Sequence, residues 1–181
     1  MSKSKKILFS LTGSIACFKA CGLLSELVKK GHVVQVVATH GAQQFIGLPT
    51  LEGLSGKKVL TDLYSAGDAM EHIDLHKWAD FHVTCPMSAH KINEFAAGLG
   101  SDLLSTLFLS YNFEKPWFMV PAMNPHMYHH PITQNSIAKL NELGVQFIGP
   151  DSGQVACGYT GLGRMLEVEQ ILTYLKHKEV V

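Results

Sequence analysis

The chain has 181 residues, of which 46% are hydrophobic and 17% are charged. These proportions are typical of one soluble globular domain and exclude an extended disordered protein. Fifteen Lys and Arg balance fifteen Asp and Glu, so no net basic field is available to hold nucleic acid or an anionic membrane. The four cysteines follow no CxxC or disulfide-framework spacing, and we therefore expect a reducing, cytoplasmic environment.

The first forty residues predict a strand, a helix and a second strand. Ile7–Leu11 is predicted to be a buried strand, residues 15–30 carry apolar side chains on one helical face, and His32–Thr39 supplies the second strand. Such a βαβ unit is expected to have a right-handed crossover.

The turn between the first strand and the helix contains Gly13 and Ser14. Backbone N–H groups and a hydroxyl at the positive end of a helix suit a phosphate group. The chain has neither GxGxxG nor GxxxxGK[ST], so no dinucleotide fingerprint or P-loop is predicted. A plain Ser N-cap is the alternative interpretation of this turn.

The middle of the chain predicts several short elements. Residues 41–58 suggest a short helix, a loop around Pro49 and another short helix, and residues 61–71 have no firm period. His72–Asp80 resembles a short helix that leads into the strand Phe81–Cys85. That strand ends in Pro-Met-Ser-Ala, a second segment that could line a ligand site. Two helices are predicted to follow. One covers 92–97, and the other runs from the caps Ser101 and Asp102 to residue 109.

His72 and His76 stand at i, i+4 and could bind zinc from one helix face. The Glu of an HExxH motif is missing and no third ligand has suitable spacing, so we predict no metal site. Exposed or capping histidines are the commoner outcome of this spacing.

A short apolar run at 116–120 is typical of a central strand in a parallel sheet, and it ends at Pro121. Asn124 follows immediately, between two prolines that restrict the backbone. Ligands of open α/β sheets bind outside the carboxyl ends of the strands, so a site is expected here. A simple turn Asn is the alternative.

A helix over about 131–143 and a strand at Val145–Ile148 bring the count to five strands that alternate with helices. This order predicts an α/β fold with a doubly wound parallel sheet, Rossmann-like or flavodoxin-like, in a single domain over 1–181. Residues 149–165 are rich in glycine and without period, which indicates a long loop or flap. Within it, Cys157 is either a reactive thiol or an ordinary buried one. Glu167–Lys178 closes the chain as an amphipathic helix.

Read together, the motifs resemble the flavin-dependent cysteine decarboxylases, and most closely those of coenzyme A biosynthesis. The resemblance covers nearly the whole chain. It rests on GSIA at 13–16, HIDLHKWAD at 72–80, PMSA at 86–89, SDLLST at 101–106, PAMN with M-Y over 121–128, and ACG with GLGRM over 156–165.

The resemblance implies FMN as cofactor and a small phosphorylated cysteine conjugate as substrate. It implies catalytic roles for His72 and Cys157. It assigns cofactor contacts to Gly13, Ser14, Ile15, Thr39, Ser88, Ala89, Ser105 and Ala122, and substrate contacts to Asn124, Met127, Ala156 and Arg164. It also implies a homotrimer or a dodecamer of trimers, with FMN at subunit boundaries, and a phosphopantothenate-cysteine ligase as a separate protein or as a domain removed from this chain.

In the chemistry that the resemblance implies, the flavin oxidises the cysteinyl carbon that bears sulfur to a thioaldehyde. Carbon dioxide is then lost, and reduced flavin with a proton from Cys157 returns a saturated aminothiol. A thioaldehyde β to the carboxylate is an electron sink for decarboxylation. The flavin therefore carries out the difficult oxidation, while the protein orients the substrate and protonates the intermediate.

Two short stretches depart from the family pattern. His90 and Lys91 follow Ser88-Ala89 where a small polar pair is usual, and Tyr159 follows ACG where an acidic residue is usual. Two other functions remain open: oxidative decarboxylation of a peptide's C-terminal cysteine, which does not need Cys157, and a non-catalytic FMN-binding regulatory subunit. A flavin prenyltransferase shares the fold outline but not the PAMN and ACG elements.

Overall fold

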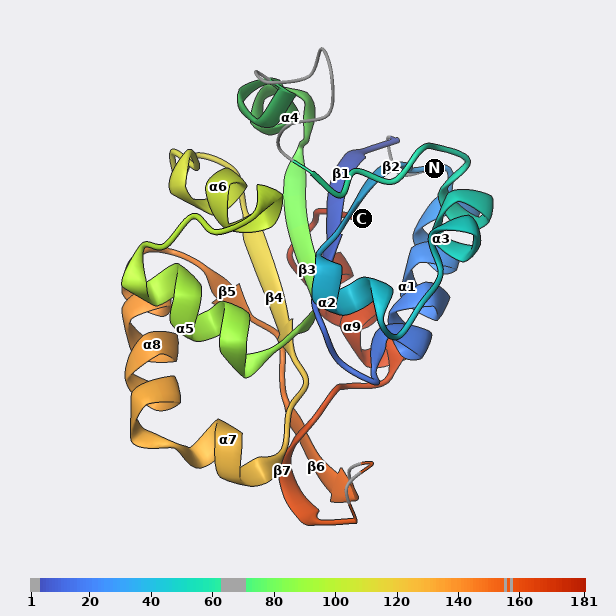
Figure 1. Cartoon of the computed structure of the whole chain (residues 1–181). Helices are drawn as coiled ribbons and strands as arrows, with labels where there is room; N and C mark the ends of the chain where they lie inside the picture. Colours follow the sequence, from blue (N-terminus) through green and yellow to red (C-terminus); the bar gives the residue numbers. More distant parts are fainter. Residues whose placement is uncertain (1–3, 63–70, 155, 157) are drawn as a thin grey trace.

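A computed structural model of the chain describes residues 4–62, 71–154, 156 and 158–181, and of residues 71–74 only the backbone (Figure 1). Its main sheet has five parallel strands in the order β2-β1-β3-β4-β5. The strands are β1 (Lys6–Leu11), β2 (Val33–Ala38), β3 (Phe81–Met87), β4 (Trp117–Pro121) and β5 (Gln146–Phe147). This order confirms the predicted doubly wound, flavodoxin-like sheet, whose strand order reverses between β1 and β3.

Helices cover both faces of the sheet (Figure 1). One face packs against α1 (Cys17–Lys29), α3 (Leu48–Ser55) and α9 (Val168–His177), and the other against α5 (Ala89–Ala97), α6 (Leu103–Leu109) and α8 (Pro131–Glu142). β3 and β4 are buried along their whole length, as the apolar run of β4 predicts for a central strand. The two apolar layers hold the carboxyl ends of these strands in fixed register.

Three predictions about local structure were wrong. Pro49 lies in the first turn of α3 and not in a loop, a position where its missing N–H costs no hydrogen bond. Residues after Asn124 form a short helix, α7 (Pro125–His129), that was not predicted. The glycine-rich segment 149–165 contains an antiparallel hairpin of β6 (Asp151–Gln154) and β7 (Thr160–Arg164), whose glycines gave no alternating pattern.

Two short helices lie at opposite edges of the sheet. α2 (His40–Gln43) follows the carboxyl end of β2, whereas α4 (Glu71–Trp78) precedes β3 and therefore lies at the amino edge. Figure 1 shows α4 at one end of the molecule and α7 with the β6–β7 hairpin at the other. No helix in the described parts of the chain is both long enough and apolar enough to cross a membrane.

Candidate functional site

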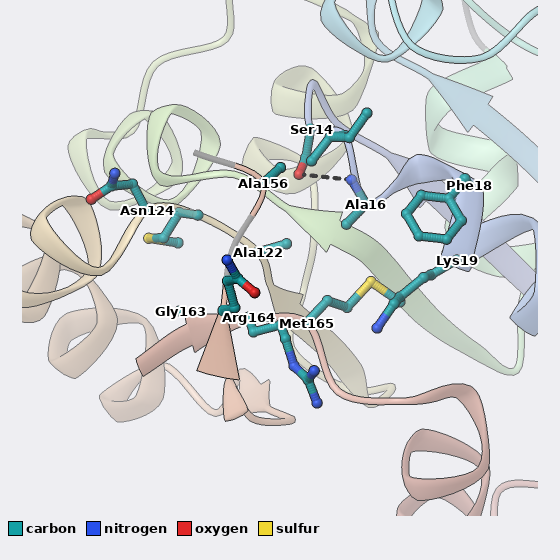
Figure 2. Close-up of a pocket in the computed structure, with 13 residues that line it drawn as sticks. Ser14, Ala16, Phe18, Lys19, Ala122, Asn124, Ala156, Gly163, Arg164 and Met165 are labelled. Atoms are coloured by element: carbon teal, nitrogen blue, oxygen red, sulfur yellow. Dashed lines mark hydrogen bonds between the residues drawn. The ribbon is translucent and has the colours of Figure 1, made fainter. Parts of the chain in front are cut away.

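A cavity of about 510 Å³ opens at the carboxyl edge of the sheet, and its volume is in the range of small-molecule sites. Figure 2 shows the start of α1 on one side, the segment after β4 on another, and β7 below. We call it the hairpin cavity. Its lining residues are Ser14, Ile15, Ala16, Phe18, Lys19, Ala122, Met123, Asn124, Gln154, Ala156, Gly163, Arg164 and Met165.

The start of α1 forms one wall of the hairpin cavity. The Ser14 hydroxyl accepts a hydrogen bond from Ala16 N at 3.2 Å, and the first turn of the helix contains no acidic residue. The positive end of this 13-residue helix is therefore not neutralised by its own sequence. The N-cap of α1 is Ala16 and it has no side-chain cap, so the plain Ser N-cap interpretation was wrong. Ser14 lines the cavity, and its contact with a phosphate stays a prediction.

Asn124 lines the cavity on the side of the segment that follows β4 (Figure 2). Its Oδ1 accepts a hydrogen bond from His126 N at 2.8 Å, which makes Asn124 the N-cap of α7. Pro125 occupies the first position of that helix, where its fixed φ is already suitable. The cap and the proline hold the amide in place at the cavity wall.

Two cations stand together in the hairpin cavity. Lys19 Nζ lies 2.6 Å from Glu167 Oε1, and an Arg164 guanidinium nitrogen lies 3.5 Å from the same oxygen and 3.5 Å from Asp151 Oδ2. The hydrogen bond from Lys19 lowers the pKa of Glu167 despite slight burial. A pair of cations beside a helix start suits a ligand with a phosphate or carboxylate group.

Gly163 fixes how closely the hairpin approaches the segment after β4. A Cβ on Gly163 would lie 2.5 Å from Met123 O, and its φ of +150° is one that L side chains rarely adopt. Met123 N donates to Gly163 O at 2.9 Å. Only glycine lets β7 run against the backbone next to Asn124.

A second cavity of about 370 Å³ lies on the other side of the Gly13–Ser14 turn, and we call it the polar cavity. It is lined by Gly13, Thr39, His40, Gly41, Ser88, His90, Lys91, Ser101, Asp102 and Met127. Thr39, Ser88 and Asp102 are the N-caps of α2, α5 and α6, so three helix starts converge on it. The cap side chains already accept from Ala42 N, Lys91 N and Ser105 N, and the hydroxyls of Thr39 and Ser88 give the cavity a polar lining.

Backbone contacts close the floor of the polar cavity. A Cβ on Gly13 would lie 3.2 Å from the backbone of Gly41. Thr12 Oγ1 donates to Pro86 O at 2.8 Å and accepts from Ser88 N at 2.8 Å. The ends of β1 and β3 are thus tied together at the point where the strand order reverses.

The structure groups most of the predicted site residues but divides them between the two cavities. Ser14, Ile15, Ala122, Asn124, Ala156 and Arg164 line the hairpin cavity, and Gly13, Thr39, Ser88 and Met127 line the polar cavity. Ala89 and Ser105 are buried and line neither of these two cavities. Cys157 lies outside the described residues, as does the side chain of His72, whose backbone belongs to α4.

Sequence reasoning missed several lining residues. Phe18 and Lys19 lie four and five residues after Ser14. This spacing places them near Ser14 on the first turn of the helix, so it could have identified them as lining residues. His40, Gly41 and Asp102 stand next to predicted strand ends and caps. Gln154, Gly163 and Met165 become neighbours only through the hairpin, which the sequence did not predict.

His76 is half-buried, so the expectation of an exposed histidine was wrong. Its Nε2 lies 2.7 Å from Leu107 O and its Nδ1 lies 3.3 Å from His82 Nε2, so it packs α4 onto the sheet. Among the described residues, no three His, Cys, Asp or Glu side chains gather as a metal site.

The described cysteines are free thiols at buried or half-buried positions: Cys17, Cys21 and Cys85. Burial raises the pKa of Cys17 to about 11 and raises that of Cys85 further. Neither thiol is suited to give up a proton near neutral pH.

The comparison with protein families decides the class. The flavoprotein family profile matches residues 1–179. The chain belongs to the flavoprotein family. This flavoprotein is 37% identical over 177 residues to the "Probable phosphopantothenoylcysteine decarboxylase" of Streptococcus mutans, covering 97% of the chain and 99% of that relative. It is 43% identical over 173 residues to the coenzyme A biosynthesis bifunctional protein CoaBC of Haemophilus influenzae, covering 94% of the chain but only 43% of that protein.

Solved structures give the same result. The flavoprotein superposes on a mutant PPC decarboxylase complexed with pantothenoylaminoethenethiol with a TM-score of 0.85, at 27% identity, covering 99% of this chain and 100% of the other. It superposes on the FMN-binding protein AtHal3 with a TM-score of 0.82, at 29% identity, covering 97% of each chain.

Proposed function

We propose that this flavoprotein is an FMN-dependent, cytoplasmic phosphopantothenoylcysteine decarboxylase of coenzyme A biosynthesis. The observation that carries the proposal is the hairpin cavity, in which a capped amide, two cations and an unneutralised helix start face one space. The Streptococcus relative has this activity in its name and matches nearly end to end. The chain spans less than half of the CoaBC relatives, so the ligase activity implied by that name is proposed only for a separate or adjoining unit.

The described residues fit FMN. The Gly13–Ser14 turn separates the two cavities and contributes to both, and hydroxyls of Thr39 and Ser88 line the polar cavity. Close backbone approach at Gly13 leaves no room for a side chain that would block this turn. We propose that these residues, with Ala122, hold the cofactor. When bound, FMN supplies the two-electron oxidation that turns the carbon next to the carboxylate-bearing carbon into an electron sink.

The protein's own groups would bind and orient the substrate and supply protons. We propose that the Asn124 amide holds the substrate carboxylate, and that Lys19 and Arg164 exchange Glu167 for the substrate phosphate. The hairpin carries Ala156 and Arg164 and would close over the substrate. Cys157, between the two hairpin strands, would donate the late proton.

The assembly proposed is a homotrimer. α4, which carries His72, lies at the amino edge of the sheet, while both cavities lie at the carboxyl edge (Figure 1). Within one chain the length of the strands separates this helix from Asn124. The position of α4 therefore supports an arrangement in which His72 serves the cavity of a neighbouring subunit.

The decisive experiment is the mass of the product from phosphopantothenoylcysteine, with a peptide ending in cysteine as the competing substrate. We expect yellow protein with about one FMN per chain and a product equal to substrate minus carbon dioxide. In Cys157→Ser, a hydroxyl far less acidic than a thiol of pKa roughly 8.5 should stop the final reduction, so the product should be two hydrogens lighter.

Other outcomes would redirect the assignment. Release of the lighter product by the unaltered protein, or turnover of the peptide alone, would favour the oxidative peptide decarboxylase. Stable FMN binding without turnover of either substrate would favour a regulatory FMN-binding subunit. Colourless protein that fails to take up FMN would remove the basis of the proposal.

A further inference from the structure

The wall of the polar cavity contains a buried ion cluster built around Lys91. Lys91 is 5% exposed, and its Nζ lies 2.7 Å from Glu94 Oε2 and 2.7 Å from Asp102 Oδ2. Both Lys91 and Asp102 line the cavity, while Glu94 lies behind them in α5 and is 6% exposed. A lysine this deeply buried is rare unless it is paired, and here it is paired twice.

Every carboxylate oxygen in the cluster has a hydrogen-bond donor. Glu94 Oε1 accepts from the hydroxyl of Ser101, and Asp102 Oδ1 accepts from Ser105 N at 2.9 Å and Ser105 Oγ at 2.7 Å. The remaining oxygen of each acid accepts from Lys91. The hydrogen bonding of both carboxylates is therefore complete, and the cluster joins the starts of α5 and α6 at the cavity wall.

The charges show what Lys91 contributes. Burial alone would raise the pKa of Glu94 and of Asp102, but hydrogen bonds from Lys91 and the neighbouring serines hold both below their usual values. Both acids are thus ionised beside the cavity at neutral pH, and Lys91 leaves one net negative charge there in place of two. His90, on the cavity rim, lies 3.4 Å from Glu94 Oε2 through its Nε2 and is 80% exposed.

The same cavity is lined by three residues proposed to contact FMN, namely Gly13, Thr39 and Ser88. FMN carries a phosphate, and two-electron reduction can add a further negative charge to its ring. Two uncompensated carboxylates in a low-dielectric wall would repel both. We propose that Lys91 is a positioning residue of the cofactor cavity, which acts by lowering the charge of the Lys91–Glu94–Asp102 cluster from two negative charges to one, so that the cavity repels FMN, and above all its reduced form, less strongly.

This inference rests on the proposed FMN-dependent function. It also explains how the chain can depart from the family's small polar pair at His90 and Lys91. The lysine does not enter the cavity as a free cation, because it forms salt bridges with two acidic residues, three and eleven positions further along the chain.

The test measures FMN affinity and the flavin midpoint potential, with no need for turnover. Apo-protein is titrated with FMN, and the holo-protein is titrated reductively with a reference dye. In Lys91→Met we expect FMN to bind at least tenfold more weakly and reduced FMN to lose a further tenfold, which lowers the two-electron midpoint by about 30 mV. Lys91→Arg should stay within threefold of the unaltered protein because it keeps the charge.

Two controls separate charge compensation from a purely structural tie between α5 and α6. Lys139→Met removes a lysine that donates to Ala96 O at 2.6 Å and lines neither cavity, so it should leave affinity and potential unchanged. The double variant Lys91→Met/Glu94→Gln should regain most of the lost affinity and potential, since it restores the net charge while leaving the salt bridges broken.

A further variant keeps the proposal testable if Lys91→Met does not fold. Glu94→Gln alone preserves the shape of the side chain and the Lys91–Asp102 pair, and it should raise the midpoint potential. An unchanged potential in Glu94→Gln, or a double variant no better than Lys91→Met, would overturn the proposal. If the unaltered protein binds no FMN the proposed function fails as well, whereas normal FMN binding in Lys91→Met overturns this inference alone.

Discussion

At the scale of single residues, Asn124 combines a structural and a proposed functional role that one substitution can separate. Its Oδ1 caps α7, and Asp caps helices as well as Asn. Asn124→Asp should therefore change the free energy of unfolding by less than about 0.5 kcal/mol. A carboxylate placed about 4 Å from the substrate carboxylate would cost on the order of 4 kcal/mol at an effective dielectric constant of 20.

We therefore expect Asn124→Asp to fold normally, to retain FMN and to lose decarboxylation by about a thousandfold, measured by product formation and chemical denaturation. Asn124→Ala is the matched control, because it removes the cap at a cost of about 0.5–2 kcal/mol without adding charge. Full activity in Asn124→Asp would mean that the substrate carboxylate binds elsewhere.

At the scale of elements, α4 is held to the rest of the molecule at its C-terminal end. The ammonium of Lys115 donates to three backbone oxygens there, at 2.7 Å to His76 O, 2.8 Å to Lys77 O and 2.5 Å to Ala79 O. The last carbonyls of a helix have no partner within it, so Lys115 satisfies groups that would otherwise need water. The helix that carries His72 depends on this cap.

Lys115→Met should release the end of α4. Hydrogen bonds to a charged donor contribute about 1.5–3 kcal/mol, so we expect a loss of stability of that order and faster amide hydrogen exchange in Leu75–Ala79. Decarboxylation should fall while FMN affinity is kept, because both cavities lie at the opposite edge of the sheet. Lys176→Met, at an exposed position in the last turn of α9, is the control. Unchanged exchange in α4 would contradict this account of the cap.

The elements also show what the sequence could and could not predict. The five parallel strands were predictable because buried strands leave short, mainly apolar runs, and the strand ends gave Ser14, Ser88 and Asn124. The hairpin was not, since its two glycine-rich strands carry no alternating apolar pattern, and the close approach of Gly163 to Met123 is a backbone contact that leaves no side-chain signal. Ion pairs between residues distant in sequence, such as Lys19 with Glu167, form only because the fold places the hairpin and α9 beside α1. Such pairs leave no pattern in the local sequence.

At the scale of the whole molecule, the separation of α4 from the cavities predicts complementation between subunits. His72→Asn and Asn124→Asp should each be inactive as pure proteins. After subunits of the two are mixed and reassembled, some sites would combine an intact His72 from one chain with an intact Asn124 from its neighbour, and activity should return. Continued inactivity of mixed assemblies, verified by native mass spectrometry, would argue against a shared site.

The pH dependence of folding is set at the same scale by a buried histidine between the helical layer and the sheet. His82 is 1% exposed, stacks on Trp117 with ring centroids 4.6 Å apart, and contacts His76. Its Nδ1 has no hydrogen-bond partner in the described part of the chain. Burial, with smaller contributions from the nearby charges of His76 and Lys115, lowers the pKa of His82 to about 3.

The direction of the effect follows from proton binding. The unfolded chain takes up a proton on this histidine near pH 6.5 and the folded chain does not until about pH 3, so stability falls as pH drops below 6.5. The loss should approach 1.4 kcal/mol per pH unit, or about 2 kcal/mol at pH 5. His32, whose pKa is also lowered by burial and by Lys30 and Lys5, adds a contribution of the same sign.

Denaturation of the FMN-loaded protein between pH 5 and 7 isolates the histidines, because carboxylates with lowered pKa values, such as Glu94 and Asp102, lose their stabilising charge only at lower pH. His82→Gln keeps a polar side chain that can reach His76 but cannot titrate, so the slope of stability against pH should become much flatter. The slope left in this variant should be the part due to His32. A slope equal to that of the unaltered protein would show that His82 is protonated in the folded state, and that α4 and β3 separate enough at mild acidity to admit water to it.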